Sequence, residues 1–191
     1  MTRLDTADHA ALPWRIHEMT ADFRVEDVWA FRTPGAGPDD FQPMLAALRS
    51  LGDDQPFLAR MLFKARWRLG ELFGWDREVH SVGGRVTSLR DRLPGDLREA
   101  PRGPDSASMP LKAVYELDCE CARELANKTV HTVMHLGWAR RPDGEYELRM
   151  AVLVKPNGWW GRAYMAAIAP FRYLVVYPAM TRQWERAWLS R

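Results

Sequence analysis

The chain has 191 residues, of which 47% are hydrophobic and 27% charged, a composition that excludes a disordered chain and fits one globular domain. Its 27 basic and 25 acidic residues leave a net charge of +2, without the basic excess typical of nucleic-acid-binding domains. Nine tryptophans supply enough large apolar surface for a wide interior. We therefore expect one domain over residues 1–191, with a loosely ordered tail over residues 1–12, and no nucleic-acid partner.

The N-terminal residues are polar, and the sequence contains no apolar run long enough for a signal peptide or a transmembrane helix. Cys119 and Cys121 are separated by one residue, which is poor geometry for a mutual disulfide. These features predict a cytoplasmic protein. Glycine-rich phosphate loops and nucleophile-elbow motifs are absent from the sequence, so we expect no cofactor. The oligomeric state stays open.

The first predicted strand covers residues 27–31 and ends at a Pro- and Gly-rich loop, residues 33–38. Asp39 and Asp40 offer an N-cap for a short amphipathic helix that ends before Gly52. A second helix is predicted from the apolar stripe that runs from Leu58 to Leu72. The sequence thus predicts one strand followed by two helices.

Residues 83–109 are rich in Gly, Pro, Ser, Arg and Asp, which predicts an irregular excursion with a short helical turn, covering one mouth of the fold. Strands follow at residues 111–117, 129–139 and 146–154, and the last two alternate in polarity and flank a turn at residues 141–144. We expect these two to pair as a hairpin whose apolar faces line one wall.

Apolar residues at helical spacing predict a long C-terminal helix from about Phe171 to Leu189, with Pro170 near its start. Pro178 falls inside this pattern and should kink the helix, because proline has no N–H to donate and its ring clashes with the preceding turn.

Four stretches, joined by the order of the predicted elements, carry a resemblance to a known family. They are residues 88–94 (SLRDRLP), 129–138 (TVHTVMHLGW), 152–158 (VLVKPNG) and 177–180 (YPAM). In these stretches the chain resembles the bacterial domain-of-unknown-function family 2867 of the START-like, polyketide-cyclase-like (SRPBCC) superfamily, and the likeness runs from about Val28 to Trp188. The resemblance implies an α+β helix-grip fold, in which a curved antiparallel sheet wraps around the long C-terminal helix and leaves a cavity between them. Superfamily relatives bind lipids, sterols and polyketides there, and some catalyse cyclisation or dehydration.

Candidate catalytic groups are few, and the family likeness transfers none. If residues 129–139 form a strand, His131 and His135 lie opposite the apolar set, on the more polar face of the sheet. Asp91 and Tyr115 complete the set of acid–base candidates. Cys119, Cys121 and the two histidines equal the number of zinc ligands, but Cys-x-Cys is tighter than the usual spacing, so we predict no metal site. Glu120 and Glu124 read as surface charge.

Large apolar side chains are the candidate ligand-binding residues, although each can equally be ordinary core. They are Trp67, Met134, Trp138, Met150, Tyr177 and Trp184.

The sequence therefore predicts a protein that binds a small hydrophobic or amphipathic metabolite between the sheet and the C-terminal helix. An enzyme of the cyclase, dehydratase or isomerase kind, acting on such a molecule, is the first alternative. A non-catalytic interaction protein is the second, working through a basic helix stripe at Arg60, Lys64 and Arg68.

Overall fold

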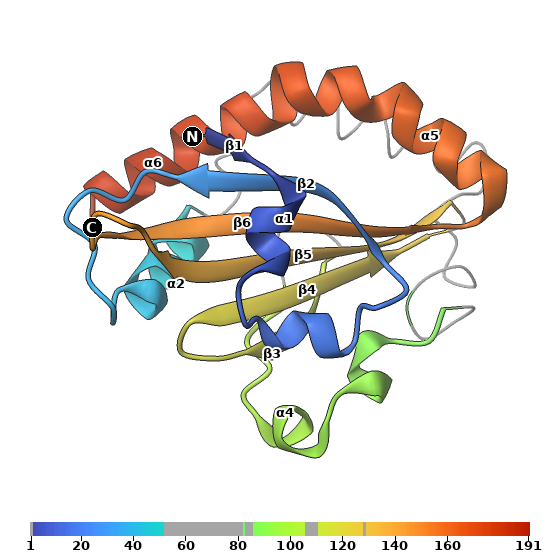
Figure 1. The fold of residues 1–191 in the computed structure, drawn as a ribbon, viewed down its shortest axis with the longest axis horizontal. Coiled ribbons are helices and arrows are strands. Elements are labelled where there is room, and N and C mark those ends of the chain that lie inside the picture. The colour runs from blue at the N-terminus through green and yellow to red at the C-terminus, as the bar shows by residue number, and fades with distance from the viewer. Residues whose placement is uncertain (1, 52–81, 83–85, 106–110, 128) are drawn as a thin grey trace.

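The computed structural model describes residues 2–51, 82, 86–105, 111–127 and 129–191. The predicted second helix, its basic stripe and Trp67 lie outside these residues. Within them the protein is an α+β structure with a six-stranded antiparallel sheet in the order β1-β2-β6-β5-β4-β3. A long helical segment at the C-terminus arcs over this sheet (Figure 1). The strands are β1 (Thr2–Leu4), β2 (Arg24–Phe31), β3 (Lys112–Glu116), β4 (Glu120–Ala126), β5 (Val130–Arg140) and β6 (Tyr146–Pro156).

The predicted hairpin is confirmed. β5 and β6 pair along their whole length, with Val130 opposite Pro156 at one end and Arg140 opposite Tyr146 at the other. Gly144 takes the positive φ of 91° that the connecting turn requires. The register places Leu136 opposite Met150 and Trp138 opposite Leu148. The two apolar faces therefore coincide, as the alternation of each strand predicts.

β4 is a strand that the sequence does not predict. Its charged residues suggest an exposed acidic stretch, but it pairs with β5 along its length, with Glu120 opposite Gly137 at one end and Ala126 opposite His131 at the other. It also pairs with β3 on its other side, where the register shifts between Ala113 and Tyr115.

Both faces of the sheet are covered. We call the face that bears Leu136 and Trp138 the helix face, and the face that bears His131 and His135 the histidine face. The helix face packs against α2 (Phe41–Ser50) and the C-terminal helical segment, in an apolar cluster that includes Phe41, Trp138 and Trp188.

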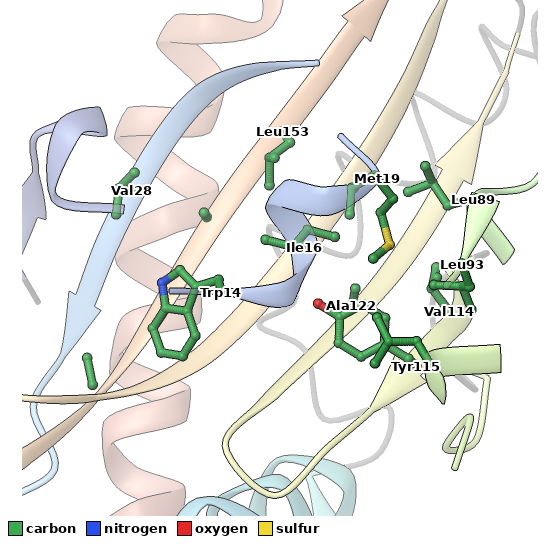
Figure 2. Packing of buried hydrophobic residues seen from close by; sticks show 14 residues of the cluster. Trp14, Ile16, Met19, Val28, Leu89, Leu93, Val114, Tyr115, Ala122 and Leu153 are labelled. Carbon is green, nitrogen blue, oxygen red and sulfur yellow. The ribbon is translucent and has the colours of Figure 1, made fainter. Parts of the chain in front are cut away.

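The histidine face is covered by segments distant in sequence. They are α1 (Thr6–Ala10), the 3-10 helix η1 (Arg15–Glu18), the 3-10 helix η3 (Leu89–Arg92) and α4 (Gly95–Glu99). Trp14, Ile16 and Met19 of the N-terminal segment belong to the same apolar cluster as Leu89 and Leu93, and Met19 lies beside Leu89 (Figure 2). The short helical turns at η3 and α4 agree with the predicted excursion, and residues 2–10, placed by the sequence in a tail, form β1 and α1.

The C-terminal helical segment starts earlier than predicted. α5 (Gly158–Phe171) precedes a π-helical turn, η4 (Arg172–Val176), which leads into α6 (Tyr177–Leu189). Pro170 and Pro178 flank this turn. Pro178 lacks the N–H of an α-helical register, and the wider turn is closed by the Tyr177 N–H, which donates to the carbonyl of Arg172. The predicted kink is thus a change of helical register.

Candidate functional site: the Asp27 centre

Asp27 lies on β2 beneath the C-terminal helical segment, and its side chain is 0% exposed. The register between β2 and β6 shifts between Val25 and Asp27, so that Glu26 is an extra residue in β2. Such a bulge redirects side chains and is over-represented beside active sites. Here it lets the carboxylates of Glu26 and Asp27 both reach Arg172.

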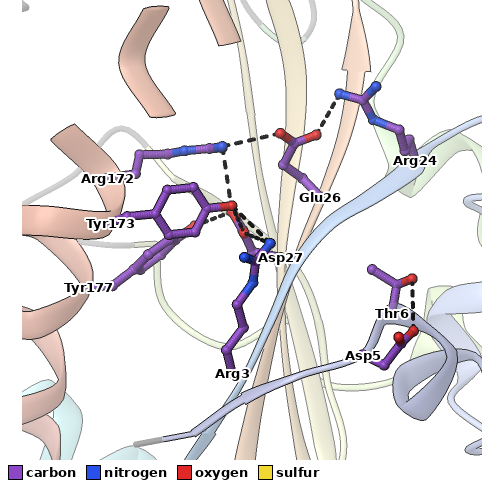
Figure 3. Close-up of polar contacts among 9 residues, drawn as sticks. All are labelled: Arg3, Asp5, Thr6, Arg24, Glu26, Asp27, Arg172, Tyr173 and Tyr177. Atoms are coloured by element: carbon purple, nitrogen blue, oxygen red, sulfur yellow. Dashed lines mark hydrogen bonds and ion pairs between the residues drawn. The ribbon is translucent and has the colours of Figure 1, made fainter. Parts of the chain in front are cut away.

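Two tyrosines of the helical segment donate hydrogen bonds to the Asp27 carboxylate. The Tyr177 hydroxyl lies 2.7 Å from Oδ2, and the Tyr173 hydroxyl donates to Oδ1. Tyr173 belongs to the π-helical turn and Tyr177 follows it directly. A single π-helical turn inside an α-helix is rare and frequently marks a functional site. The strand bulge and the helical irregularity therefore meet at one carboxylate (Figure 3).

Arginines complete the Asp27 centre, which we define as Arg3, Glu26, Asp27, Arg172, Tyr173 and Tyr177. Nη2 of Arg172 lies 3.6 Å from Asp27 and 3.2 Å from Glu26. Nη2 of Arg3 lies 3.5 Å from Asp27 and 3.2 Å from the Tyr173 hydroxyl. The guanidinium groups of both arginines lie over the Tyr173 ring, 4.9 Å from its centroid for Arg3 and 5.7 Å for Arg172.

The electrostatics keep both phenols protonated. Burial raises the pKa of Tyr177 above its usual range, and the Asp27 carboxylate adds to the effect. Burial and Asp27 also raise the pKa of Tyr173. Burial opposes the charge on Arg172, but Tyr177, Asp27 and Glu26 outweigh it and raise the pKa of this guanidinium. The centre thus holds a carboxylate that accepts hydrogen bonds from neutral phenols beside a permanent cation.

Two buried donors at this face lack a hydrogen-bond acceptor within the described part of the chain. They are Nε of Arg172 and Nε1 of Trp29. Trp29 follows Asp27 by two residues on β2, and its ring lies 4.9 Å from the Tyr177 ring. Because buried polar groups in folded proteins are nearly always paired, each unpaired donor calls for an explanation.

The described ligand-binding candidates gather in one cluster on the helix face: Met134, Trp138, Met150, Tyr177 and Trp184. Their rings pack against their neighbours, with Trp184 4.7 Å from Phe31 and Trp138 5.8 Å from Trp188 between centroids. Near α6 this cluster is therefore densely packed core. Tyr177 is the candidate that also belongs to the Asp27 centre.

The catalytic candidates lie on the histidine face. His135 and Tyr115 share one partner, since His135 Nε2 is 2.8 Å and the Tyr115 hydroxyl 2.9 Å from Oε2 of Glu120. His131 Nε2 lies 2.9 Å from Oε2 of Glu124. Asp91 is exposed on η3. The histidine face is thus opposite the C-terminal helical segment, as the strand alternation predicts.

The assignment of Glu120 and Glu124 to the surface was wrong, because they are 2% and 1% exposed. Each pairs diagonally across β4 and β5 with a histidine, and the two pairs repeat at a spacing of four residues. Burial disfavours both charges, but the donors around each carboxylate together outweigh it and lower its pKa. For Glu120 these are His135, the Arg15 backbone and Tyr115, and for Glu124 they are His131, Ser88 and the Leu89 backbone. Alternation within residues 120–126, together with His131-x-x-x-His135, is the signal that predicts this arrangement.

Cys119 is exposed and Cys121 lies on the helix face, away from the histidines. No cluster of three or more metal-ligating side chains occurs among the described residues. No helix in that part of the chain is long and apolar enough to cross a membrane.

The fold and this centre define an α+β protein whose buried carboxylate joins a sheet to a long C-terminal helical segment. The family model described as "Protein of unknown function (DUF2867)" matches residues 19–179, and the chain belongs to that family. No curated protein and no solved structure matches it.

Proposed function

We propose that the protein binds a small hydrophobic or amphipathic molecule between the sheet and the C-terminal helical segment, as START-like, helix-grip proteins do, with the polar group of that molecule at the Asp27 centre. The observation that carries the proposal is the buried Arg172 Nε–H, which has no acceptor among the described residues and lies beside a carboxylate that already has its own donors. A ligand oxygen would satisfy this donor.

The unpaired donors indicate the polar chemistry of the ligand. Arg172 Nε and Trp29 Nε1 can only donate. A matching group accepts hydrogen bonds, as a carbonyl or a carboxylate does. Arg172 favours the carboxylate, because a guanidinium pairs with it in a charge-assisted bond.

The apolar part of the ligand belongs toward α5. Val152 lies opposite Asp27 on β6 and borders two apolar clusters. The cluster toward α6 is filled by aromatic rings, whereas the cluster toward α5 is small, with Val130, Val154 and Met165 at its centre. A molecule whose oxygen accepts a hydrogen bond from Arg172 and whose apolar chain runs along Val152 would have a polar partner for its polar end and an apolar surface for its chain, as an amphipathic ligand requires.

An enzymatic role for the same centre has one specific support. Tyr173 is half-buried, and its phenol hydrogen-bonds to a buried carboxylate, an arrangement that can hold a proton in place for transfer. His131 and His135 face away from this centre, so they cannot contact a ligand held there. Turnover would therefore rest on Tyr173 and Asp27.

The first experiment is native mass spectrometry of freshly purified protein, followed by organic extraction and identification of the bound compound. The variant Arg172→Lys keeps the positive charge but removes Nε. The control Arg24→Lys alters an exposed arginine that pairs with the other side of Glu26. We expect a stoichiometric adduct in the wild type and in Arg24→Lys, and at least tenfold less in Arg172→Lys.

Titration with fatty acids of ten to sixteen carbons, followed by tryptophan fluorescence, extends the test to an empty protein. Saturable binding that weakens in Arg172→Lys supports the proposal. An apo mass together with no fatty-acid binding would refute it, as would an adduct that Arg172→Lys retains in full.

A further inference from the structure

A pair of buried histidines joins the N-terminal segment to the sheet. His9 of α1 and His135 of β5 are each 1% exposed, and His9 Nε2 lies 3.0 Å from His135 Nδ1. A second polar contact lies close by, where the backbone N–H of Arg15 donates to Oε1 of Glu120 at 2.8 Å. These contacts join α1 and η1 to β4 and β5.

The hydrogen bonds define where the protons are at neutral pH. Glu120 is a carboxylate, so the facing His135 Nε2 carries a proton and His135 Nδ1 is left as an acceptor. His9 must then donate through Nε2, which leaves its Nδ1 as a buried lone pair without a partner in the described part of the chain. Both imidazoles are neutral in this arrangement.

An added proton does not fit this pair in either position. A proton on His9 makes a cation of a buried ring that His17 and Arg149 already disfavour. A proton on His135 Nδ1 forces His9 to turn its own proton to Nδ1, where a buried N–H would lack an acceptor. Either form costs stability only while the N-terminal segment is docked.

The groups that face the pair come from every element around it. Within the described part of the chain, Glu120 of β4 is the negative charge in contact with the pair, and it also accepts hydrogen bonds from Tyr115 of β3 and from the Arg15 backbone. Arg149 comes from β6, His17 from η1, and α4 contributes Asp96, which pairs with Arg15 on the outside.

We propose that the His9–His135 contact is a pH-dependent clasp, which holds residues 6–20 on the histidine face at neutral pH and releases them as the solution is acidified. Release would uncover the apolar surface beneath Trp14, Ile16 and Met19 (Figure 2). The clasp is independent of the ligand proposed for the opposite face.

The direction follows from linkage. Burial, followed by the neighbouring His135, His17 and Arg149, lowers the pKa of His9 to about 3, and burial also lowers the pKa of His135. In the released segment His9 returns to about 6.5. The released state therefore binds more protons below pH 6.5, and docking weakens by up to about tenfold per pH unit for one proton. Glu120 titrates below its usual range, so the window from pH 7.5 to 5.0 isolates the histidines.

Amide hydrogen exchange on the whole chain tests the clasp, with rates corrected for the intrinsic effect of pH. The reporters are amides bonded within the segment, such as Ala11 to Ala7 and Met19 to Ile16, read against those of β5 and β6. From pH 6.5 to 5.0 we expect segment protection to fall by about fifteenfold relative to the strands, because the released His9 is already half protonated at pH 6.5. The change should be flat in His9→Gln, whose side-chain amide replaces the Nε2–H of His9.

Equal protection at both pH values in the wild type would overturn the proposal, and so would a pH response that survives in His9→Gln. If that variant does not fold, the imidazole nitrogen spectrum of the wild type decides. The proposal requires His9 and His135 to be neutral, both with the proton on Nε2, at pH 7. A charged imidazole in the docked state at that pH would overturn it.

Discussion

Removing the Tyr177 hydroxyl tests whether the Asp27 centre fastens the helical segment to the sheet. The substitution Tyr177→Phe keeps the ring, which packs 4.9 Å from Trp29, and deletes the donor that lies 2.7 Å from Asp27 Oδ2. Because Tyr177 is 4% exposed, water cannot replace this donor. A buried hydrogen bond to a charged group contributes about 1.5–3 kcal/mol, so we expect a loss of about 2 kcal/mol in the free energy of unfolding.

Tyr173→Phe is the matched control, because its hydroxyl donates to the other oxygen of the same carboxylate from a half-buried position. Water can take over that role, and we expect a loss below about 1 kcal/mol. Urea unfolding followed by circular dichroism gives both values, and the thermal midpoint should fall by about 4–8 °C in Tyr177→Phe. Equal losses in the two variants, or no loss in Tyr177→Phe, would refute the reasoning.

Three further predictions concern stability. Gly161→Ala should lower the free energy of unfolding, measured in urea, by about 1–3 kcal/mol, because the new Cβ would lie 2.2 Å from the carbonyl oxygen of Thr129. In the control Gly95→Ala the new Cβ meets nothing within 4 Å, so stability should change by less than about 0.5 kcal/mol. Glu120→Ala should lower the free energy of unfolding by about 3–5 kcal/mol, because the buried groups that now donate hydrogen bonds to this carboxylate would lose their acceptor. A loss below about 1 kcal/mol would contradict the buried pairing. Raising the pH above about 10 should destabilise the wild type, because the raised pKa of Tyr177 keeps its phenol protonated when folded while the unfolded chain ionises; Tyr177→Phe should show a shallower loss between pH 9 and 11.

Much of the sheet could be predicted from the sequence, because strict alternation in residues 129–139 and 146–154 leaves one register that buries both apolar sets. β4 was missed because the sequence prediction left the second face of the sheet open to solvent. On that assumption the charged residues of this stretch indicate an exposed segment, whereas in the structure the second face is covered. Periodicity within a strand does not show which distant segment will cover it. The N-terminal start of α5 was missed because Gly158, Gly161 and Pro170 read as helix breakers.

The Asp27 centre has no local signal. Asp27 meets Tyr173 and Tyr177 across 146 and 150 positions of sequence, and the strand bulge that aims it follows from pairing with β6. The buried Glu–His pairs are intermediate between the β5–β6 hairpin, which the sequence predicts, and the Asp27 centre, which it does not. Their four-residue spacing is visible in the sequence, but it indicates a pairing only after β4 has been assigned as a strand.

The strand order has a consequence for biosynthesis. β2 lies between β1 and β6, so the long partner of Arg24–Phe31 is the strand Tyr146–Pro156, made much later. During translation the run Val28-Trp29-Ala30-Phe31, buried in the finished protein, stays without that partner until β6 leaves the ribosome. The β4–β5–β6 meander joins sequence neighbours and can form first. A chaperone that covered the nascent strand Arg24–Phe31 would therefore protect its apolar residues until β6 is made.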